Sequence, residues 1–286
     1  MKSGCTFPCP FCEGQKVTWA GKNVLRSNKG INALAEMYAA PEEEGGGGGI
    51  RSNGKNFKCC VSSPLIGDAT DDTPVLLVFV PPALHLKLGI NKLLQLLKLF
   101  WPGLVDWMLS KLHIDIKDYQ GKQGNVEGRG ADTFLNNIEE LEKVIPAEWE
   151  LFIPCFKAFR AVIKACFGCY TLEEDYKVKI AEFKTTQDEL YAEIDRITSG
   201  WTPKQKPPAH VTTKFHIMDE HIITFCDHFG LPLGAFSKQG LERIHATFAR
   251  LWEVRFAVNN VENPNYGPEL LKCGLLLNYE QVMCLG

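Results

Sequence analysis

The sequence lacks a long apolar run, because no stretch of about 18 residues is free of charged side chains. This absence excludes a membrane-spanning helix of the usual kind. The first residues also lack the apolar segment that a secretory signal peptide requires. Together the two absences predict an intracellular protein that has no membrane partner.

The sequence also lacks an excess of basic residues. There are 31 Lys and Arg against 34 Asp and Glu, which gives a net charge of -3. This balance argues against a chain that binds nucleic acid over its whole surface. A local basic pair, Lys204 and Lys206, could still contact nucleic acid, but a solvated linker is the preferred interpretation.

Phosphate-binding loops are missing as well, although glycine-rich stretches are present. The glycine run at 42–49 has no strand before it and no Gly-Lys-Ser/Thr after it, so the P-loop pattern fails. The glycines at 121–130 have neither dinucleotide-binding nor Walker spacing. We instead predict a flexible loop at 42–55, where proteolysis should cut first.

The chain has 11 cysteines, an odd number that does not favour a disulfide framework. In a reducing compartment they are better interpreted as thiols and metal ligands. Cys9 and Cys12 form a C-x2-C motif, which is half of a tetrahedral metal site. Cys166 and Cys169 form a second C-x2-C, but they close an apolar helix, where cysteine usually serves as a small hydrophobe.

His216 and His221 offer the other half of such a site. We predict one helix from Phe215 to Phe229, ended by Gly230. A regular helix turns about 500° over five residues, so the two imidazoles would point about 140° apart and need ligands from elsewhere. The cysteine motif could supply them across a gap of roughly 200 residues, far longer than in a zinc finger. The alternative is two reduced thiols and two hydrogen-bonded helix histidines.

Most of the remaining chain shows helical periodicity, which predicts a mainly α fold. An exception is the apolar run at 74–82, which we interpret as a short buried strand or extended segment. We expect three parts: 1–73 with the cysteine motif, a short helix and the flexible loop; 74–209 as a helical body; and 210–286 with the histidine helix and further helices. The apolar stripes predict helices near 31–40, 86–101, 104–112, 134–141, 152–163, 176–197, 215–229 and 269–281.

Four segments resemble, in order, the catalytic core of V(D)J-recombinase-like transposases. TFPCPFC looks like that family's cysteine motif, ALHLKLGINKLLQLL resembles the start of its helical insert, and QGNVEGRG lies where the family has a Gly-Asn turn. FHIMDEHIITFCDHFGLPLGAFSKQGLERIHATFARLW is similar to the carboxyl-terminal part of the core. The resemblance extends over roughly 9–278. It implies one zinc ion bound by Cys9, Cys12, His216 and His221.

The resemblance also implies a catalytic role for an acidic residue. Such transposases cut and join DNA with three acidic residues on a ribonuclease H-like core, which hold two divalent cations. Glu242 is the nearest match to the third acid, whereas the two aspartates would precede the cysteine motif and are not in this sequence. Mg²⁺ or Mn²⁺ binding is therefore expected only if those acids are supplied.

The leading hypothesis is a transposase-derived fragment or remnant, a helical body clasped by a Cys2His2 zinc site and lacking the sheet of the core. It would meet DNA, in the nucleus, through a larger assembly or as a homo-oligomer, without strand transfer of its own. A second hypothesis is a metal-free helical protein-interaction domain. A third is a zinc hydrolase, suggested by Glu220 beside His221, although the spacing is one residue longer than in inverted zinc proteases.

Overall fold

The computed structural model describes residues 6–39, 58, 60, 62, 68–114, 117–119, 122–168 and 171–236, apart from 17, 203 and 208. Residues 117–119 and 122–124 are described by their backbone only. The chain forms two units, 1–236 and 237–286, and every described residue belongs to the first. The predicted loop at 42–55, the predicted helix at 269–281 and Glu242 lie outside the described residues. The three-part division of the chain stays a prediction.

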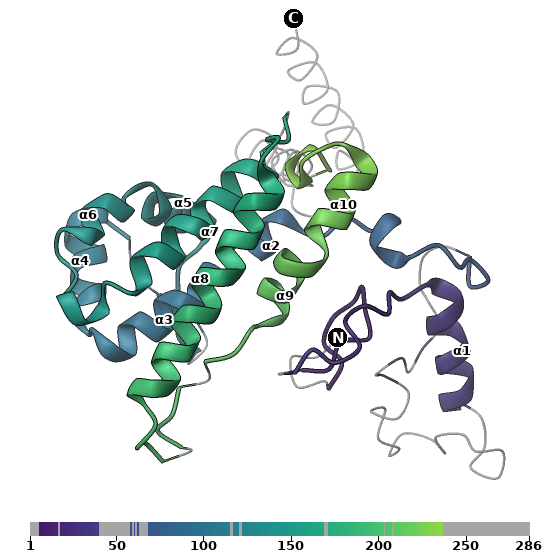
Figure 1. Ribbon diagram of the computed structural model, residues 1–286, viewed down its shortest axis with the longest axis horizontal. Helices are drawn as coiled ribbons and strands as arrows, with labels where there is room; N and C mark the ends of the chain where they lie inside the picture. Colours follow the sequence, from purple (N-terminus) through teal and green to yellow (C-terminus); the bar gives the residue numbers. More distant parts are fainter. Residues whose placement is uncertain are drawn as a thin grey trace, which may run out of the picture. The chain divides into compact units, whose positions relative to one another are not determined.

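The described part of the chain is mainly helical, as the sequence predicts (Figure 1). Its strands are two short antiparallel segments, β1 (Lys117–Tyr119) and β2 (Lys122–Asn125). None of the described helices is both long and apolar enough to cross a membrane. The helices are α1 (Asn28–Ala39), α2 (Ala83–Lys87), α3 (Ile90–Phe100), α4 (Gly103–Leu112), α5 (Gly128–Asn136), α6 (Ile138–Glu142), α7 (Phe152–Cys166), α8 (Tyr176–Ile197), α9 (Thr213–Glu220) and α10 (Ile222–Phe229).

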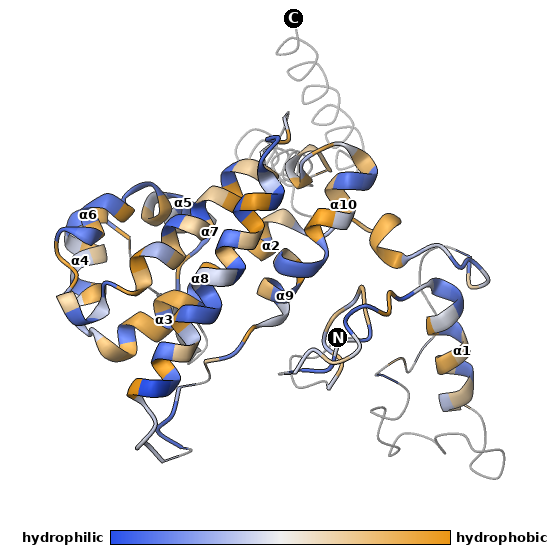
Figure 2. Ribbon diagram, viewed as in Figure 1, coloured by the Kyte–Doolittle hydropathy of each residue, from blue (hydrophilic) through white to orange (hydrophobic). Residues whose placement is uncertain are grey.

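Helices α7 and α8 pack side by side and form the centre of the helical body (Figure 1). Both were expected from their apolar stripes, and the expected core residues are buried except for Ile163 and Ile197, which are only partly buried. Hydrophobic and hydrophilic residues alternate along their ribbons, as in helices with one buried face (Figure 2). Their fully buried apolar residues include Phe152, Phe156, Phe159, Phe183 and Ile194.

An aromatic group of three residues fixes α9 against this central pair. Phe159 of α7, Phe183 of α8 and Phe215 of α9 are completely buried. Their ring centroids lie 5.3 to 5.9 Å apart in edge-to-face arrangements, the geometry that aromatic quadrupoles favour. The histidine-bearing helix is therefore held by the hydrophobic core as well as by its polar contacts.

The helix predicted from Leu86 to Trp101 is wrong in one respect, because the chain breaks at Leu88 and Gly89 into α2 and α3. A Cβ atom on Gly89 would lie 2.9 Å from Cε1 of Phe215 and 2.8 Å from the Leu86 carbonyl oxygen. Glycine therefore allows this corner to approach α9 closely. A single glycine within an apolar stripe gives no sign of such a break.

Two further predictions need correction. The apolar run at 74–82 contains a 3-10 helix, η3 (Val75–Leu77), where we expected a strand or extended segment. Val75 and Leu76 are buried as predicted, but a short apolar run between prolines does not distinguish a strand from a helical turn. The stripe at 134–141 is divided at Asn137 between α5 and α6.

Candidate metal centre

The structure brings together the two half-sites that the sequence predicted. The ligand atoms of Cys9, Cys12, His216 and His221, hereafter the Cys2His2 cluster, all lie within 4.8 Å of one another. The four side chains are at most 2% exposed. Two contacts cross the long sequence gap: Sγ of Cys9 lies 3.4 Å from Nε2 of His221, and Sγ of Cys12 lies 3.2 Å from Nε2 of His216.

The dimensions of the Cys2His2 cluster fit a tetrahedral metal ion. Zinc bonds of about 2.3 Å to sulfur and about 2.0 Å to nitrogen place a sulfur and a nitrogen about 3.5 Å apart in a tetrahedral site. The two sulfur–nitrogen distances, 3.4 and 3.2 Å, need only small adjustments to reach that value. Two sulfur and two imidazole donors also form a donor set that zinc commonly accepts. The buried cluster could therefore hold a metal ion such as zinc.

In the cysteine knuckle, residues 6–14, backbone N–H groups donate hydrogen bonds to the two sulfurs, an arrangement that favours metal-binding thiolates. The backbone N–H groups of Phe11 and Gly14 donate to the sulfurs of Cys9 and Cys12, at 3.4 and 3.3 Å. The pKa of the Cys12 thiol is lowered because the neighbouring Cys9 thiol, the two imidazoles and the Gly14 N–H stabilise its thiolate. The thiolate is the form that binds metal.

The histidines reach the cluster because their helix is interrupted between them. We predicted one helix from Phe215 to Phe229, and this is wrong, since α9 ends at Glu220 and α10 begins at Ile222. His221 lies at the junction with φ -115 and ψ -26, away from ideal helical values. The rings of His216 and His221 consequently lie 4.9 Å apart and almost perpendicular, at 89°. No glycine or proline marks this junction.

Trp19 supports the cluster in a way that the sequence did not indicate. Its ring stacks on His216 with a centroid distance of 3.7 Å and an interplanar angle of 3°. Gly14 makes room for it, because a Cβ there would lie 2.9 Å from Cε3 of Trp19. Trp19 has a positive φ of 53°, an uncommon value for a bulky residue. No spacing rule would have identified this residue.

Arg26 stabilises the cysteine knuckle through hydrogen bonds of its guanidinium group. This nearly fully buried side chain donates to the Cys12 carbonyl oxygen at 2.8 Å, to the Cys60 sulfur at 2.8 Å and to the Lys58 carbonyl oxygen at 3.1 Å. Burial raises the pKa of Cys60, although Arg26 opposes that effect. Cys60 accepts a hydrogen bond from Arg26, and sequence reasoning missed both residues.

Glu220 of α9 connects the segment that follows the knuckle to α8. Its carboxylate accepts from Lys22 at 2.6 Å and from Lys184 of α8 at 2.7 Å. Burial alone would raise its pKa, but the two lysine hydrogen bonds outweigh burial, so the pKa of Glu220 is lowered. The residue that suggested a hydrolase is an ionised carboxylate held by two cations.

Cys166, one half of the competing C-x2-C motif, is buried at the end of α7. A hydrogen bond with Cys226 of α10, together with burial, raises the pKa of Cys166. This agrees with the prediction that Cys166 belongs to the core. Cys169 lies outside the described residues.

No protein-family model matches this chain, and no curated protein is significantly similar to it. The proposed family membership therefore rests on the residues quoted above. The catalytic role of Glu242 stays a prediction.

Proposed function

We propose that the Cys2His2 cluster binds one structural zinc ion that joins the cysteine knuckle to α9 and α10. The observation that carries this proposal is the convergence of four buried ligand atoms within 4.8 Å from segments roughly 200 residues apart. Burying two thiols and two imidazoles in one place is costly without a cation, whereas a zinc ion satisfies all four.

A structural role is favoured over a catalytic one. Two sulfurs and two imidazoles complete a tetrahedral shell, so no position stays open for a water molecule. The carboxylate that a hydrolase would use as a base, Glu220, is engaged by Lys22 and Lys184. The zinc-hydrolase hypothesis has no support from this arrangement.

We further propose that the chain derives from the V(D)J-recombinase-like transposases, as a zinc-clasped part of their ribonuclease H-like core. The resemblance assigned the same four residues to one zinc ion, and their proximity in the structure supports it. In this proposal the chain meets DNA, in the nucleus, as part of a larger or homo-oligomeric assembly. It has no strand-transfer activity of its own, because the resemblance assigns it only one of the three acids.

Metal analysis of the purified chain tests the zinc proposal. We expect one zinc per molecule in the parent protein and in Cys166→Ala, a buried cysteine outside the cluster. Cys12→Ser should lose most of its zinc, because a serine hydroxyl is a poor zinc ligand. Less than half an equivalent in the parent, or full zinc in Cys12→Ser, would contradict the proposal. A zinc-free, folded parent would favour the metal-free protein-interaction domain.

A DNA-nicking assay tests the family proposal separately. The 286-residue chain should show no nicking with Mg²⁺ or Mn²⁺, because one carboxylate cannot hold two ions in line. When the expected acidic segment is fused ahead of the knuckle, nicking should appear and disappear again with Glu242→Gln. Nicking by the unfused chain, or fused-chain nicking that survives Glu242→Gln, would overturn the proposed role.

A further inference from the structure

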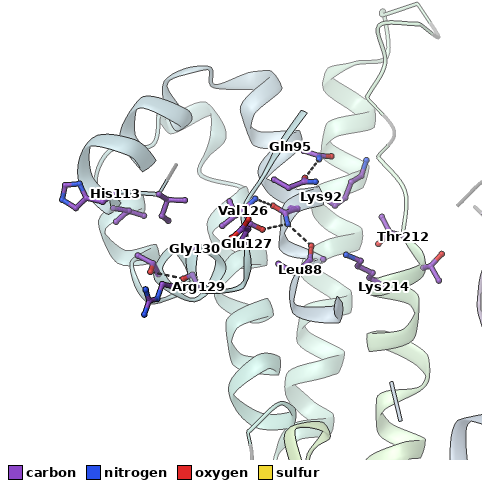
Figure 3. A pocket seen from close by; sticks show the side chains of 17 residues that line it. Leu88, Lys92, Gln95, His113, Val126, Glu127, Arg129, Gly130, Thr212 and Lys214 are labelled. Carbon is purple, nitrogen blue, oxygen red and sulfur yellow. Dashed lines mark hydrogen bonds between the residues drawn. The ribbon is translucent and has the colours of Figure 1, made fainter. Parts of the chain in front are cut away.

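A cavity of about 1050 Å³ lies in the helical body and involves none of the residues of the Cys2His2 cluster. Its walls come from α3, the segment after α4, the start of α5 and the start of α9. Figure 3 shows Lys92 and Lys214 on the side of Leu88, with Arg129 and His113 on the opposite side. A cavity of this size can hold a small organic molecule.

The walls of the cavity are fixed by hydrogen bonds and packing. The side chain of Asn91 donates to the Val126 carbonyl oxygen at 3.0 Å and accepts from the Val126 N–H at 2.7 Å. Gln95 donates to Asn125 at 2.9 Å. On the other side, the close approach of Gly89 to Phe215 sets the start of α9 beside α3. The site is therefore preformed, which reduces the entropic cost of binding.

The charges of the cavity differ from those of the chain as a whole. Three cations, Lys92, Arg129 and Lys214, line it with one carboxylate, Glu127, although the chain has a net charge of -3. In the part of the chain that the structure describes, none of these three cations forms an ion pair. Lys87 at the edge of this region, in contrast, is paired with Asp132.

Lys92 is the cation of this cavity whose positive charge an anion would stabilise most. It is half-buried, and burial lowers its pKa with no carboxylate to oppose the effect. The pKa of nearby His210 is lowered by burial and then by the positive charges of Lys92 and Lys16. Cations that are close together and partly removed from water gain most from an anion that shares their space.

The start of α9 offers donors to the same anion. Thr212, Thr213 and Lys214 all line the cavity. The Thr212 hydroxyl accepts from the N–H of Phe215 at 3.4 Å, which leaves the N–H groups of Thr213 and Lys214 without a partner inside the helix. Backbone N–H groups at a helix start, next to lysine ammonium groups, suit phosphoryl oxygens.

We propose that this cavity binds a small phosphorylated anion, with Lys92, Lys214 and the first N–H groups of α9 on the phosphate and Arg129 on a second anionic group. A small ligand fits better than a nucleic-acid backbone, because Lys92 is half-buried in a cavity and does not stand on an exposed ridge. The space beyond the phosphate is bordered by Leu112 and Ile114, which suits an organic part. This site is independent of zinc and of the proposed ancestry.

Calorimetric titration of the full chain with inorganic pyrophosphate tests the proposal. We expect one ligand per chain, with affinity that falls as salt rises. Lys92→Gln should weaken binding about tenfold or more, because a charge-assisted hydrogen bond is lost. Lys98→Gln, on the same helix but outside the cavity, should leave the affinity unchanged. Glu127→Gln should strengthen binding severalfold, a gain that misfolding cannot imitate.

Two results would overturn the proposal. The first is no binding of pyrophosphate at millimolar concentration, or equal affinities for Lys92→Gln and Lys98→Gln. The second concerns a short DNA duplex used as a parallel probe. Duplex binding that depends on Lys92, while pyrophosphate neither binds nor competes, would assign these cations to a nucleic-acid backbone instead.

Discussion

Asp219, which lies between His216 and His221 in the sequence, is buried with few partners. The nearest donor is Nε2 of Gln187, 3.5 Å from its Oδ2. In the described part of the chain, Oδ1 of Asp219, Oε1 of Gln187 and the Tyr191 hydroxyl have no hydrogen-bond partner. Burial raises the pKa of Asp219 well above its ordinary value. The contribution of Asp219 to stability is therefore most favourable below its ordinary pKa of 3.8, and this contribution falls as the pH rises through the folded-state pKa.

We predict that Asp219→Asn stabilises the protein at pH 7, because it removes a carboxylate that burial disfavours. Each unit by which the pKa is raised corresponds to about 1.4 kcal/mol. The gain should shrink as the pH falls toward the ordinary value of the carboxyl group. Urea unfolding at several pH values measures it, with Asp188→Asn, an exposed neighbour on α8, as the matched control. A large loss of stability in Asp219→Asn at pH 7 would mean that the carboxylate has an ionic partner.

At the scale of single elements, α9 depends on its aromatic anchor. We predict that Phe215→Ala lowers the free energy of unfolding by about 3 to 5 kcal/mol, because it empties a buried site among Phe159 and Phe183. Phe79→Ala, at a half-buried position, should cost clearly less. Denaturant unfolding compares the two variants. Equal losses would show that the aromatic group does not hold α9.

The sequence predicted elements well where an apolar stripe was long, and poorly where packing decided the outcome. The helix from Tyr176 to Ile197 was expected with its observed bounds, because its stripe repeats over many turns. The breaks at Gly89 and His221 could not be predicted, since each depends on a partner distant in sequence. The same holds for Trp19, whose contact with His216 exists only after folding.

The four residues of the Cys2His2 cluster could be predicted in part from the sequence. Spacing suggested two half-sites and left their joining open, because a gap of roughly 200 residues carries no local signal, and the family resemblance then favoured the joined site. Their proximity in the structure supports the joined site. The support from Arg26 and from the Lys22–Glu220–Lys184 contacts has no sequence motif, so it became visible only in three dimensions.

At the scale of the whole molecule, a zinc ion between distant segments should contribute directly to folding. We predict that a strong chelator makes the knuckle and the segment 213–229 susceptible to limited proteolysis, whereas α7 and α8 persist because they pack mainly against each other. Mapping the cuts by mass spectrometry measures this, and added zinc should restore protection. Identical cleavage with and without chelator would show that metal does not join these segments.

X-ray absorption at the zinc edge tests the joined site most directly, because it reports the atoms around the metal. We predict two sulfurs at about 2.3 Å and two imidazole nitrogens at about 2.0 Å, with no oxygen ligand. In Cys12→Ser, any residual zinc should show one sulfur fewer. A shell of four sulfurs, or one containing oxygen in the parent protein, would contradict binding by Cys9, Cys12, His216 and His221.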